Sequence, residues 1–247
     1  MSVLGIIPAR YQSSRFPGKP LVKIAGKSMI QRVYEQVGKY KGISFCTIAT
    51  DDQRIFDHCL TFTDEVVMTS PNHLTGTDRC IEALNSWIEQ HNEQPNYVVN
   101  IQGDEPFIHP TQLQLVHQCL LNTAADVATL VFEETQTDRL FDVNVVKVVK
   151  TKNNRALYFS RQAIPFVRNQ STNDWATHTS FFSHIGLYGF KTEVLLQLKN
   201  LKPSALELAE SLEQLRWMEN GFDVYVAVTD RKTVGIDTPE DLDRLRL

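Results

Sequence analysis

Short apolar runs alternate with amphipathic stretches along the first half of the chain, and this alternation predicts its elements. The runs VLGIIPA, FCTIATDD, EVVMT, NYVVNIQGDEP and DVATLVF have the length and apolar character of buried parallel strands. Between them, apolar residues recur at helical spacing, as in Met29, Val33 and Val37 after the possible N-cap Ser28. Strands that alternate with single helices imply βαβ units and a parallel sheet.

After the fifth predicted strand the pattern changes. VVKVVKT, ALYFSR and HIGLYGFK predict several strands with little helix between them, and hence an antiparallel excursion. PSALELAESLEQLRWMENG then predicts one long helix, which Ser204 would cap and Gly221 would end. DVYVAV predicts a last strand and TPEDLDRLRL a closing helix. With no internal repeat or low-complexity linker, the pattern predicts a single domain over residues 1–247, of a mostly parallel, Rossmann-like α/β fold.

Composition agrees with this fold and excludes some classes of protein. Hydrophobic residues make up 42% of the chain, which is enough for a sizeable core. The formal net charge of −4 argues against general nucleic-acid binding, which needs a basic surface. The chain shows no signal-peptide pattern, no apolar stretch of the roughly 20 residues that a membrane helix needs, and no CxxC pair. We therefore expect a soluble cytoplasmic protein with free thiols.

Positive charge is concentrated near the N-terminus. Six cations precede the first carboxylate, Glu35, and they are Arg10, Arg15, Lys19, Lys23, Lys27 and Arg32. The loop PARYQSSRFPGK, after the first strand, has neither the GxGxxG nor the GxxxxGK[ST] spacing of known phosphate-binding motifs. Arginine offers forked contacts to phosphate oxygens and lysine a point charge, so this loop suits a triphosphate. A solvated basic loop is the alternative.

Other polar clusters follow predicted strands, where open α/β sheets bind their ligands. Asp104 and Glu105 in NIQGDEP are placed to hold Mg²⁺, or else they form a solvated turn. Asp237 in VGIDTPEDL is equally a second metal ligand or a turn residue. Thr77 and Arg79 in HLTGTDR offer a helix start to a base or a phosphate, although a plain N-cap explains that motif as well.

The second half of the chain carries polar groups suited to a sugar. Arg161 and His184 are candidates for gripping a substrate carboxylate, although a lone histidine is more often structural. Glu213 and Gln214, which share a helix side with Glu210 by spacing, suit hydroxyl groups. A solvated helix face is the default interpretation of that pattern.

These segments together resemble one known family. IPARYQSSRFPGKPL, ATDD, TGTDR, QGDEP, YFSRQAIPF, HIGLYGF, ESLEQLRWMENG and GIDTPEDL occur in the order seen in 3-deoxy-manno-octulosonate (Kdo) cytidylyltransferases, also called CMP-Kdo synthetases. The resemblance runs from about residue 3 to residue 246. The first motif and QGDEP are shared with CMP-sialic acid synthetases, whereas SLEQLR and the pair YFSR and HIG are more particular to the CMP-Kdo enzymes.

The resemblance implies a reaction, a nucleotide-diphospho-sugar transferase type of fold and roles for individual residues. CTP and the acid sugar Kdo would give CMP-Kdo and diphosphate, with Mg²⁺, for lipopolysaccharide biosynthesis. The implied catalytic residues are Arg10, Lys19, Asp104 and Asp237, of which the two aspartates are the metal ligands. The implied nucleotide-binding residues are Arg10, Ser13, Ser14, Lys19, Thr77, Arg79 and Gln102. The implied sugar-binding residues are Gln102, Arg161, His184, Tyr188, Glu213 and Gln214.

The resemblance also implies a homodimer, with much of the contact formed by an embedded antiparallel subregion at about residues 135–190. Other functions stay open. A CMP-sialic acid synthetase, or a cytidylyltransferase for the 8-amino variant of Kdo, would use similar motifs with another sugar. A non-catalytic nucleotide-sensing protein would bind CTP without turnover, and a dehydrogenase is disfavoured by the missing glycine fingerprint.

Overall fold

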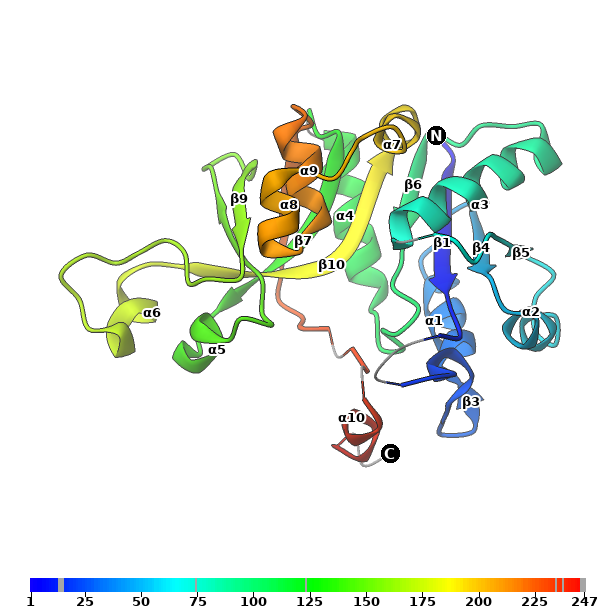
Figure 1. Cartoon of the computed structure of the whole chain (residues 1–247), viewed down its shortest axis with the longest axis horizontal. Helices are drawn as coiled ribbons and strands as arrows, with labels where there is room; N and C mark the ends of the chain where they lie inside the picture. The colour runs from blue at the N-terminus through cyan, green and yellow to red at the C-terminus, as the bar shows by residue number, and fades with distance from the viewer. Residues whose placement is uncertain (13–15, 74, 123, 234, 237, 245–247) are drawn as a thin grey trace. The chain divides into compact units, whose positions relative to one another are not determined.

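The computed structural model describes residues 1–12, 16–73, 75–122, 124–233, 235–236 and 238–244 (Figure 1). The chain forms two compact units: unit 1 comprises Met1–Gln114 and Thr233–Leu247, and unit 2 comprises Leu115–Lys232. Compactness alone does not show that a unit folds independently, so the single domain over residues 1–247 stays a prediction. In the described part of the chain, no helix is long and apolar enough to cross a membrane.

Unit 1 is built on a parallel sheet. In spatial order its strands are β6 (Tyr97–Asn100), β1 (Val3–Ala9), β4 (Phe45–Thr50) and β5 (Val66–Met68). The chain runs outward from β1 through β4 to β5 and then returns to the other side of β1 to form β6. The strand order therefore reverses between β1 and β6, and open α/β sheets bind ligands at such a point, beyond the carboxyl ends of the strands.

The helices of unit 1 follow the strands of its sheet along the chain and are labelled in Figure 1. They include α1 (Met29–Val37), α2 (Gln53–Cys59), α3 (Gly76–His91) and the start of α4 (Pro110–Asn122). Met29 and Val33 are fully buried on α1, as their spacing predicts. The side chains of Ser28, Asp52 and Thr75 accept backbone N–H groups at the starts of α1, α2 and α3.

A small hairpin and the end of the chain complete unit 1. The 3-10 helix η1 (Lys19–Leu21) leads into the antiparallel pair β2 (Lys23–Ile24) and β3 (Lys27–Ser28). The final helix is α10 (Pro239–Arg244). A buried apolar cluster joins α10 to the hairpin region, and its members are Ile24, Met29, Ile236, Phe16, Phe107 and Leu242. The C-terminal segment is thereby packed against the residues that follow the basic loop.

Unit 2 has a mixed sheet. Its strand β7 (Val127–Glu134) pairs in parallel with β11 (Val224–Thr229) and antiparallel with β10 (Phe181–Lys191). The strand β8 (Lys147–Lys150) pairs antiparallel with β10 and with β9 (Ala156–Ser160). The predicted antiparallel excursion is therefore confirmed, and with the sheet of unit 1 the chain has the predicted α/β fold. The helical segments of unit 2 include α5 (Thr137–Phe141), η2 (Thr172–Asp174), α6 (Trp175–His178), α7 (Thr192–Leu198), α8 (Ala205–Glu210) and α9 (Glu213–Glu219).

The single long helix predicted for residues 203–221 is wrong. Ser204 does start a helix, through a capping box in which it and Glu207 exchange hydrogen bonds. That helix, α8, ends at Ser211, whose φ of 52° is left-handed. The N–H of Leu212 then donates to the Glu207 carbonyl at 3.2 Å, the long bond of a Schellman motif. Gly221, with a φ of 86°, follows the second helix, so the predicted end is confirmed.

Candidate active site

The loops that follow β1 and β6 meet where the strand order of unit 1 reverses. The Lys19 ammonium lies 2.6 Å from Oδ2 of Asp104, and 31% of the Asp104 side chain is exposed. The N–H of Ile236 donates to the Asp104 carbonyl at 3.1 Å, which brings the C-terminal segment to the same loop. Asp237 itself lies outside the described residues. The structure thus joins Lys19 and Asp104, and it places the neighbour of Asp237 beside them.

Two glycines allow the backbone to take this course. A Cβ on Gly103 would lie 2.7 Å from the carbonyl oxygen of Pro8, so a side chain there would push the loop after β6 away from β1. Gly18 has a φ of 73°, and its N–H donates to the Tyr11 carbonyl at 2.9 Å. Glycine adopts this left-handed conformation without steric cost. The loop after β1 can therefore turn back and deliver Lys19 to Asp104.

The other cations of the basic stretch differ in how they are engaged. Arg10 is exposed and forms no ion pair with any residue that the structure describes. Lys27 pairs with Glu35 at 2.7 Å, and Arg32 donates to two backbone carbonyls of the β2–β3 turn. Ser13, Ser14 and Arg15 fall outside the described ranges. Arg10 directly follows β1 and Lys19 contacts Asp104, so these two cations are placed for an anionic ligand.

Arg79 is buried and paired, which the sequence did not reveal. Its Nη2 lies 2.6 Å from Oδ2 of Asp51, and its Nη1 donates to the Thr69 hydroxyl. Arg79 and Thr77, both in the first turn of α3, are 3% and 4% exposed. Asp51 follows β4 in the motif ATDD. The motif marked the position of Asp51, but nothing in the sequence showed that Asp51 pairs with Arg79. Gln102 follows β6 and is half-buried.

Glu105, which the sequence placed beside Asp104 either to hold Mg²⁺ or in a solvated turn, is buried, so the solvated alternative is wrong for this residue. It is 8% exposed, and its Oε2 has no hydrogen-bond partner among the described residues. Burial, and then the charge of Asp104, raises the pKa of Glu105 to about 7. Two adjacent carboxyl groups, one of them with an unpartnered oxygen, are the donor chemistry of a hard cation such as Mg²⁺.

A metal at this loop would not be held by the protein alone. In the described ranges, no group of three or more His, Cys, Asp or Glu side chains could bind an ion without further ligands. Mg²⁺ commonly takes one or two carboxylates and completes its coordination with substrate phosphates and water. The residues present therefore fit Mg²⁺ that arrives with a nucleotide.

The predicted sugar-binding residues of unit 2 lie along β10 and α9. His184 and Tyr188 have ring centroids 5.2 Å apart, and Tyr188 meets Trp217 of α9 edge-on at 5.1 Å. Burial, and then the charge of Glu213, raises the pKa of Tyr188 well above its usual value. Gln214 is 4% exposed, and no described group accepts from its Nε2. Glu213 is paired with Arg216 at 2.7 Å, so the donor that this cluster offers to a hydroxyl-rich ligand is Nε2 of Gln214.

Arg161, the other predicted sugar ligand, is engaged with backbone. Its Nε donates to the Glu210 carbonyl at 2.6 Å, and its two terminal nitrogens donate to the carbonyls of Val143 and Ser211. The Ser160 hydroxyl and the Arg161 N–H donate to the Glu210 carboxylate. These contacts join β9 to the break between α8 and α9. Three of the five guanidinium N–H groups are used, so a direct contact with substrate stays a prediction.

We expect replacement of His184 by glutamine to reduce the acid sensitivity of folding. Burial lowers the pKa of His184 to about 3, from an ordinary value of 6.5. Below pH 6.5 the unfolded chain therefore binds a proton that the folded chain does not, and stability falls as the pH falls. At pH 5, the lowered pKa of His184 reduces the free energy of unfolding by about 2 kcal/mol.

Denaturant unfolding of wild type and His184→Gln at pH 7 and pH 5 measures this effect. From pH 7 to pH 5, the free energy of unfolding of the variant should rise by about 2 kcal/mol relative to that of wild type. His178→Gln, at an exposed position on α6, is the matched control and should leave the pH profile unchanged. Parallel profiles for wild type and His184→Gln would contradict a buried neutral imidazole.

Comparison with known proteins identifies the class to which this fold and site belong. The Cytidylyltransferase family profile matches residues 4–230, so the chain belongs to the cytidylyltransferases. It is 50% identical to the 3-deoxy-manno-octulosonate cytidylyltransferase of Parabacteroides distasonis, over 99% of this chain and 96% of that protein. It is 51% identical to the enzyme of the same name from Bacteroides thetaiotaomicron, over 98% and 96%. The chain is therefore a member of the 3-deoxy-manno-octulosonate cytidylyltransferase family, and the resemblance seen in its motifs is confirmed.

Solved structures agree with this assignment. A CMP:2-keto-3-deoxy-manno-octonic acid synthetase complexed with CTP superposes with a TM-score of 0.89 at 37% identity, over 100% of this chain and 97% of that one. A 4-diphosphocytidyl-2C-methyl-D-erythritol synthase superposes with a TM-score of 0.66 at 11% identity, over 100% and 98%. The second likeness shows a shared fold, and the first, at 37% identity, confirms the nucleotidyltransferase type of sheet.

Proposed function

We propose that this protein activates Kdo for lipopolysaccharide biosynthesis: CTP and Kdo give CMP-Kdo and diphosphate. The observation that carries this proposal is the identity of 50–51% to relatives of that name over 98–99% of the chain. The geometry supports it, because unit 1 presents a lysine and carboxyl groups at the switch point of its sheet and unit 2 presents a polar, aromatic cluster.

Unit 1 is proposed to bind the nucleotide. Arg10 and Lys19 contact the triphosphate, together with Ser13 and Ser14, by forked and point-charge interactions. Thr77, Arg79 and Gln102 form the side that takes cytosine and ribose. Because Arg79 is buried against Asp51, its contribution is to hold the first turn of α3 in place.

Asp104 and Asp237 are the proposed ligands of Mg²⁺. When bound, the ion supplies neutralisation of phosphate charge and Lewis-acid polarisation of the reacting oxygens. The Lys19 ammonium contacts the Asp104 carboxylate in the structure. When CTP binds, the ammonium is placed to leave the carboxylate and to contact a phosphate oxygen instead. Support for the pair comes from the bond between Ile236 and Asp104, which holds the two segments together.

Unit 2 is proposed to bind the sugar, through His184, Tyr188, Glu213, Gln214 and Arg161. Gln102, implied by the resemblance, is a further proposed sugar ligand. The anomeric hydroxyl of Kdo attacks the α-phosphorus in line, and diphosphate leaves. No covalent bond to the protein is needed. Catalysis comes from orientation of the two substrates and from the charge that Arg10 and Lys19 offer to the leaving diphosphate.

Diphosphate release from CTP, Mg²⁺ and Kdo tests the proposal. Turnover should require the sugar and should be fastest with Kdo when Kdo, its 8-amino variant and sialic acid are compared. Faster turnover with sialic acid or the amino sugar would assign the protein to that substrate instead. Calorimetric CTP binding without diphosphate release from any of these sugars would favour a nucleotide-sensing protein.

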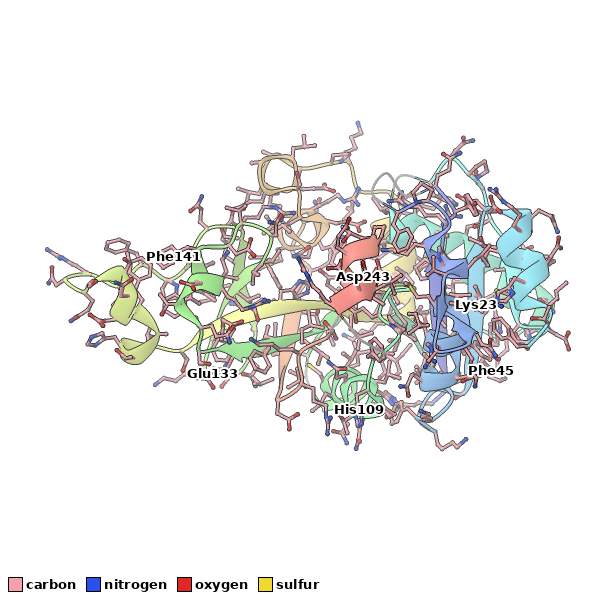
Figure 2. All side chains as sticks on the ribbon, turned by 90° about the horizontal axis from the view of Figure 1, so that it is seen from below. Lys23, Phe45, His109, Glu133, Phe141 and Asp243 are labelled. Atoms are coloured by element: carbon pink, nitrogen blue, oxygen red, sulfur yellow. The ribbon has the colours of Figure 1, made fainter. Side chains whose placement is uncertain are left out.

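We also propose a homodimer whose contact includes the subregion at about residues 135–190. Trp175 is buried within a group of aromatic rings, with centroids 5.5 Å from Phe141 and 5.1 Å from Phe166. Yet Phe166 is 75% exposed and Phe141, labelled in Figure 2, is 45% exposed. Neighbouring exposed aromatic side chains are typical of protein–protein contacts.

The cytoplasm is the proposed compartment, because the four cysteines are all free thiols, which suits a reducing environment.

Replacing Phe166 by aspartate should convert the dimer to monomers at micromolar concentration. A charge in place of a central aromatic side chain weakens association by about 30-fold or more, the effect of losing a hot spot. Size-exclusion chromatography with light scattering measures it across a dilution series. Leu208→Asp is the matched control, because Leu208 is 69% exposed on α8, outside that subregion. Equal masses for wild type and Phe166→Asp would exclude this part of the contact.

A further inference from the structure

Thr129 lies at an irregularity in the strand ladder of unit 2. The antiparallel register of β10 against β7 shifts between Ile185 and Tyr188, which marks a β-bulge. Thr129, on β7, is fully buried, and its hydroxyl oxygen lies 3.1 Å from the Ile185 carbonyl oxygen and 2.9 Å from that of Leu187. The same hydroxyl oxygen lies 2.9 Å from Nε2 of His184. One hydroxyl therefore faces two carbonyl oxygens and one imidazole nitrogen.

The protons available determine how these groups pair. A hydroxyl donates one hydrogen bond and can accept two. Both carbonyl oxygens are acceptors, so the Thr129 proton goes to one of them and the hydroxyl accepts from an Nε2–H of His184. In the other tautomer, the hydroxyl would donate to Nε2 and would present only lone pairs to two carbonyl oxygens, which is unfavourable in a buried site.

The opposite nitrogen of the ring, Nδ1, then carries a lone pair. Among the described residues, no group donates to Nδ1 of His184. Phe159 meets the ring edge-on at 5.2 Å and Tyr188 packs at 5.2 Å, so neighbouring aromatic rings fix its plane. Burial lowers the pKa of His184 to about 3, and the imidazole is therefore neutral near pH 7.

We propose that Thr129 is a positioning residue that makes His184 a hydrogen-bond acceptor, so that Nδ1 accepts a hydroxyl group of the sugar substrate. The identity of the sugar rests on the proposed function. A neutral imidazole that presents a lone pair repels a carboxylate, so the carboxylate grip considered for His184 from sequence is replaced by recognition of a hydroxyl group. The unpartnered Nε2 of Gln214, on the neighbouring helix, complements it as a donor.

Two substitutions distinguish the effect of the Thr129 hydroxyl group from the effect of its side-chain volume. Thr129→Val removes the hydroxyl at nearly constant volume, whereas Thr129→Ser retains it. Proteins labelled with ¹⁵N in the histidine rings are compared by NMR without substrate, and the His184 signals are assigned from their loss in His184→Gln. Wild type and Thr129→Ser should show a protonated Nε2 and an unprotonated Nδ1. Thr129→Val should show an averaged mixture of tautomers.

Steady-state kinetics provides the second measurement. Thr129→Val should raise the KM for Kdo about tenfold, the value of one hydrogen bond, and leave the KM for CTP within about twofold. Thr129→Ser should match wild type in both. A protonated Nδ1 in wild type would overturn the proposal, as would an unchanged KM for Kdo in Thr129→Val. An equal rise in both KM values would overturn it too, because it would indicate a general structural role.

The NMR measurement also separates this inference from the proposed function. If wild type releases no diphosphate with Kdo, the proposed function fails, and the tautomer of His184 is still read directly from the ligand-free protein. If wild type is active with Kdo and Nδ1 is protonated, the proposed function stands and the role of Thr129 is refuted.

Discussion

Asp104→Asn is expected to lower the rate of diphosphate release from CTP and Kdo by about 100- to 1,000-fold, as removal of one preorganised electrostatic group does. Asparagine keeps the size of the side chain but removes the charge that holds the Lys19 ammonium at 2.6 Å. The same charge is the one proposed to hold Mg²⁺. The substitution therefore weakens the positioning of Lys19 and the binding of Mg²⁺ together, and both are proposed to act on the triphosphate. The rate is measured at saturating CTP and Kdo, so that the loss is read in kcat.

Asp57→Asn is the matched control for this experiment. It makes the same chemical change at an exposed position on α2, and turnover should stay within about twofold of wild type. Lys19→Met alone and combined with Asp104→Asn completes a double-mutant cycle. Because the two groups are in contact, the combined loss should be smaller than the product of the single losses. Full turnover by Asp104→Asn would exclude this carboxylate from the chemistry.

Local pattern was a good guide where local interactions decide the structure. The apolar run VLGIIPA forms β1 (Val3–Ala9) with the predicted bounds, because a buried parallel strand is continuously apolar. Ser28 caps α1 and Ser204 caps α8, because a cap needs only a side-chain oxygen and a nearby N–H. The predicted long helix failed at Ser211, where Arg161, 50 positions earlier, donates to the backbone carbonyl. No periodicity in the helix itself records that contact.

The candidate site shows the same limit. Motifs identified the loops after β1 and β6, but Lys19 and Asp104 are 85 positions apart and only the strand order brings them together. The pairing of Arg79 with Asp51, 28 positions away, was likewise hidden, although both residues stood in quoted motifs. Thr129 is a further example, because its proposed role depends on its contact with His184 and on its burial. Neither property can be read from the sequence around Thr129.

Replacing Arg79 by methionine should destabilise the protein by about 3–5 kcal/mol, because it leaves the Asp51 carboxylate unpaired beside a buried hydroxyl. The Arg79 and Asp51 side chains are only 4% and 16% exposed, so solvent cannot replace the lost partner effectively. For a chain of this length, such a loss lowers the midpoint of thermal unfolding by about 10 °C or more. Thermal unfolding followed by circular dichroism, without nucleotide, measures it.

The pair Arg54–Asp52, whose arginine is exposed, supplies the comparison that makes this prediction specific to burial of the arginine. Arg54 contacts Asp52 at 2.7 Å but is 60% exposed, so Arg54→Met should leave the midpoint of thermal unfolding close to that of wild type. Asp51→Asn should lower the cost of Arg79→Met in a double variant, since no unpaired charge then remains. If Arg79→Met unfolded at the wild-type temperature and only the KM for CTP rose, Arg79 would be a direct ligand of the nucleotide and not the support of α3. The buried ion pair argues for the support, because a guanidinium already bound to a carboxylate and a hydroxyl contributes to the nucleotide site mainly through the helix that it holds.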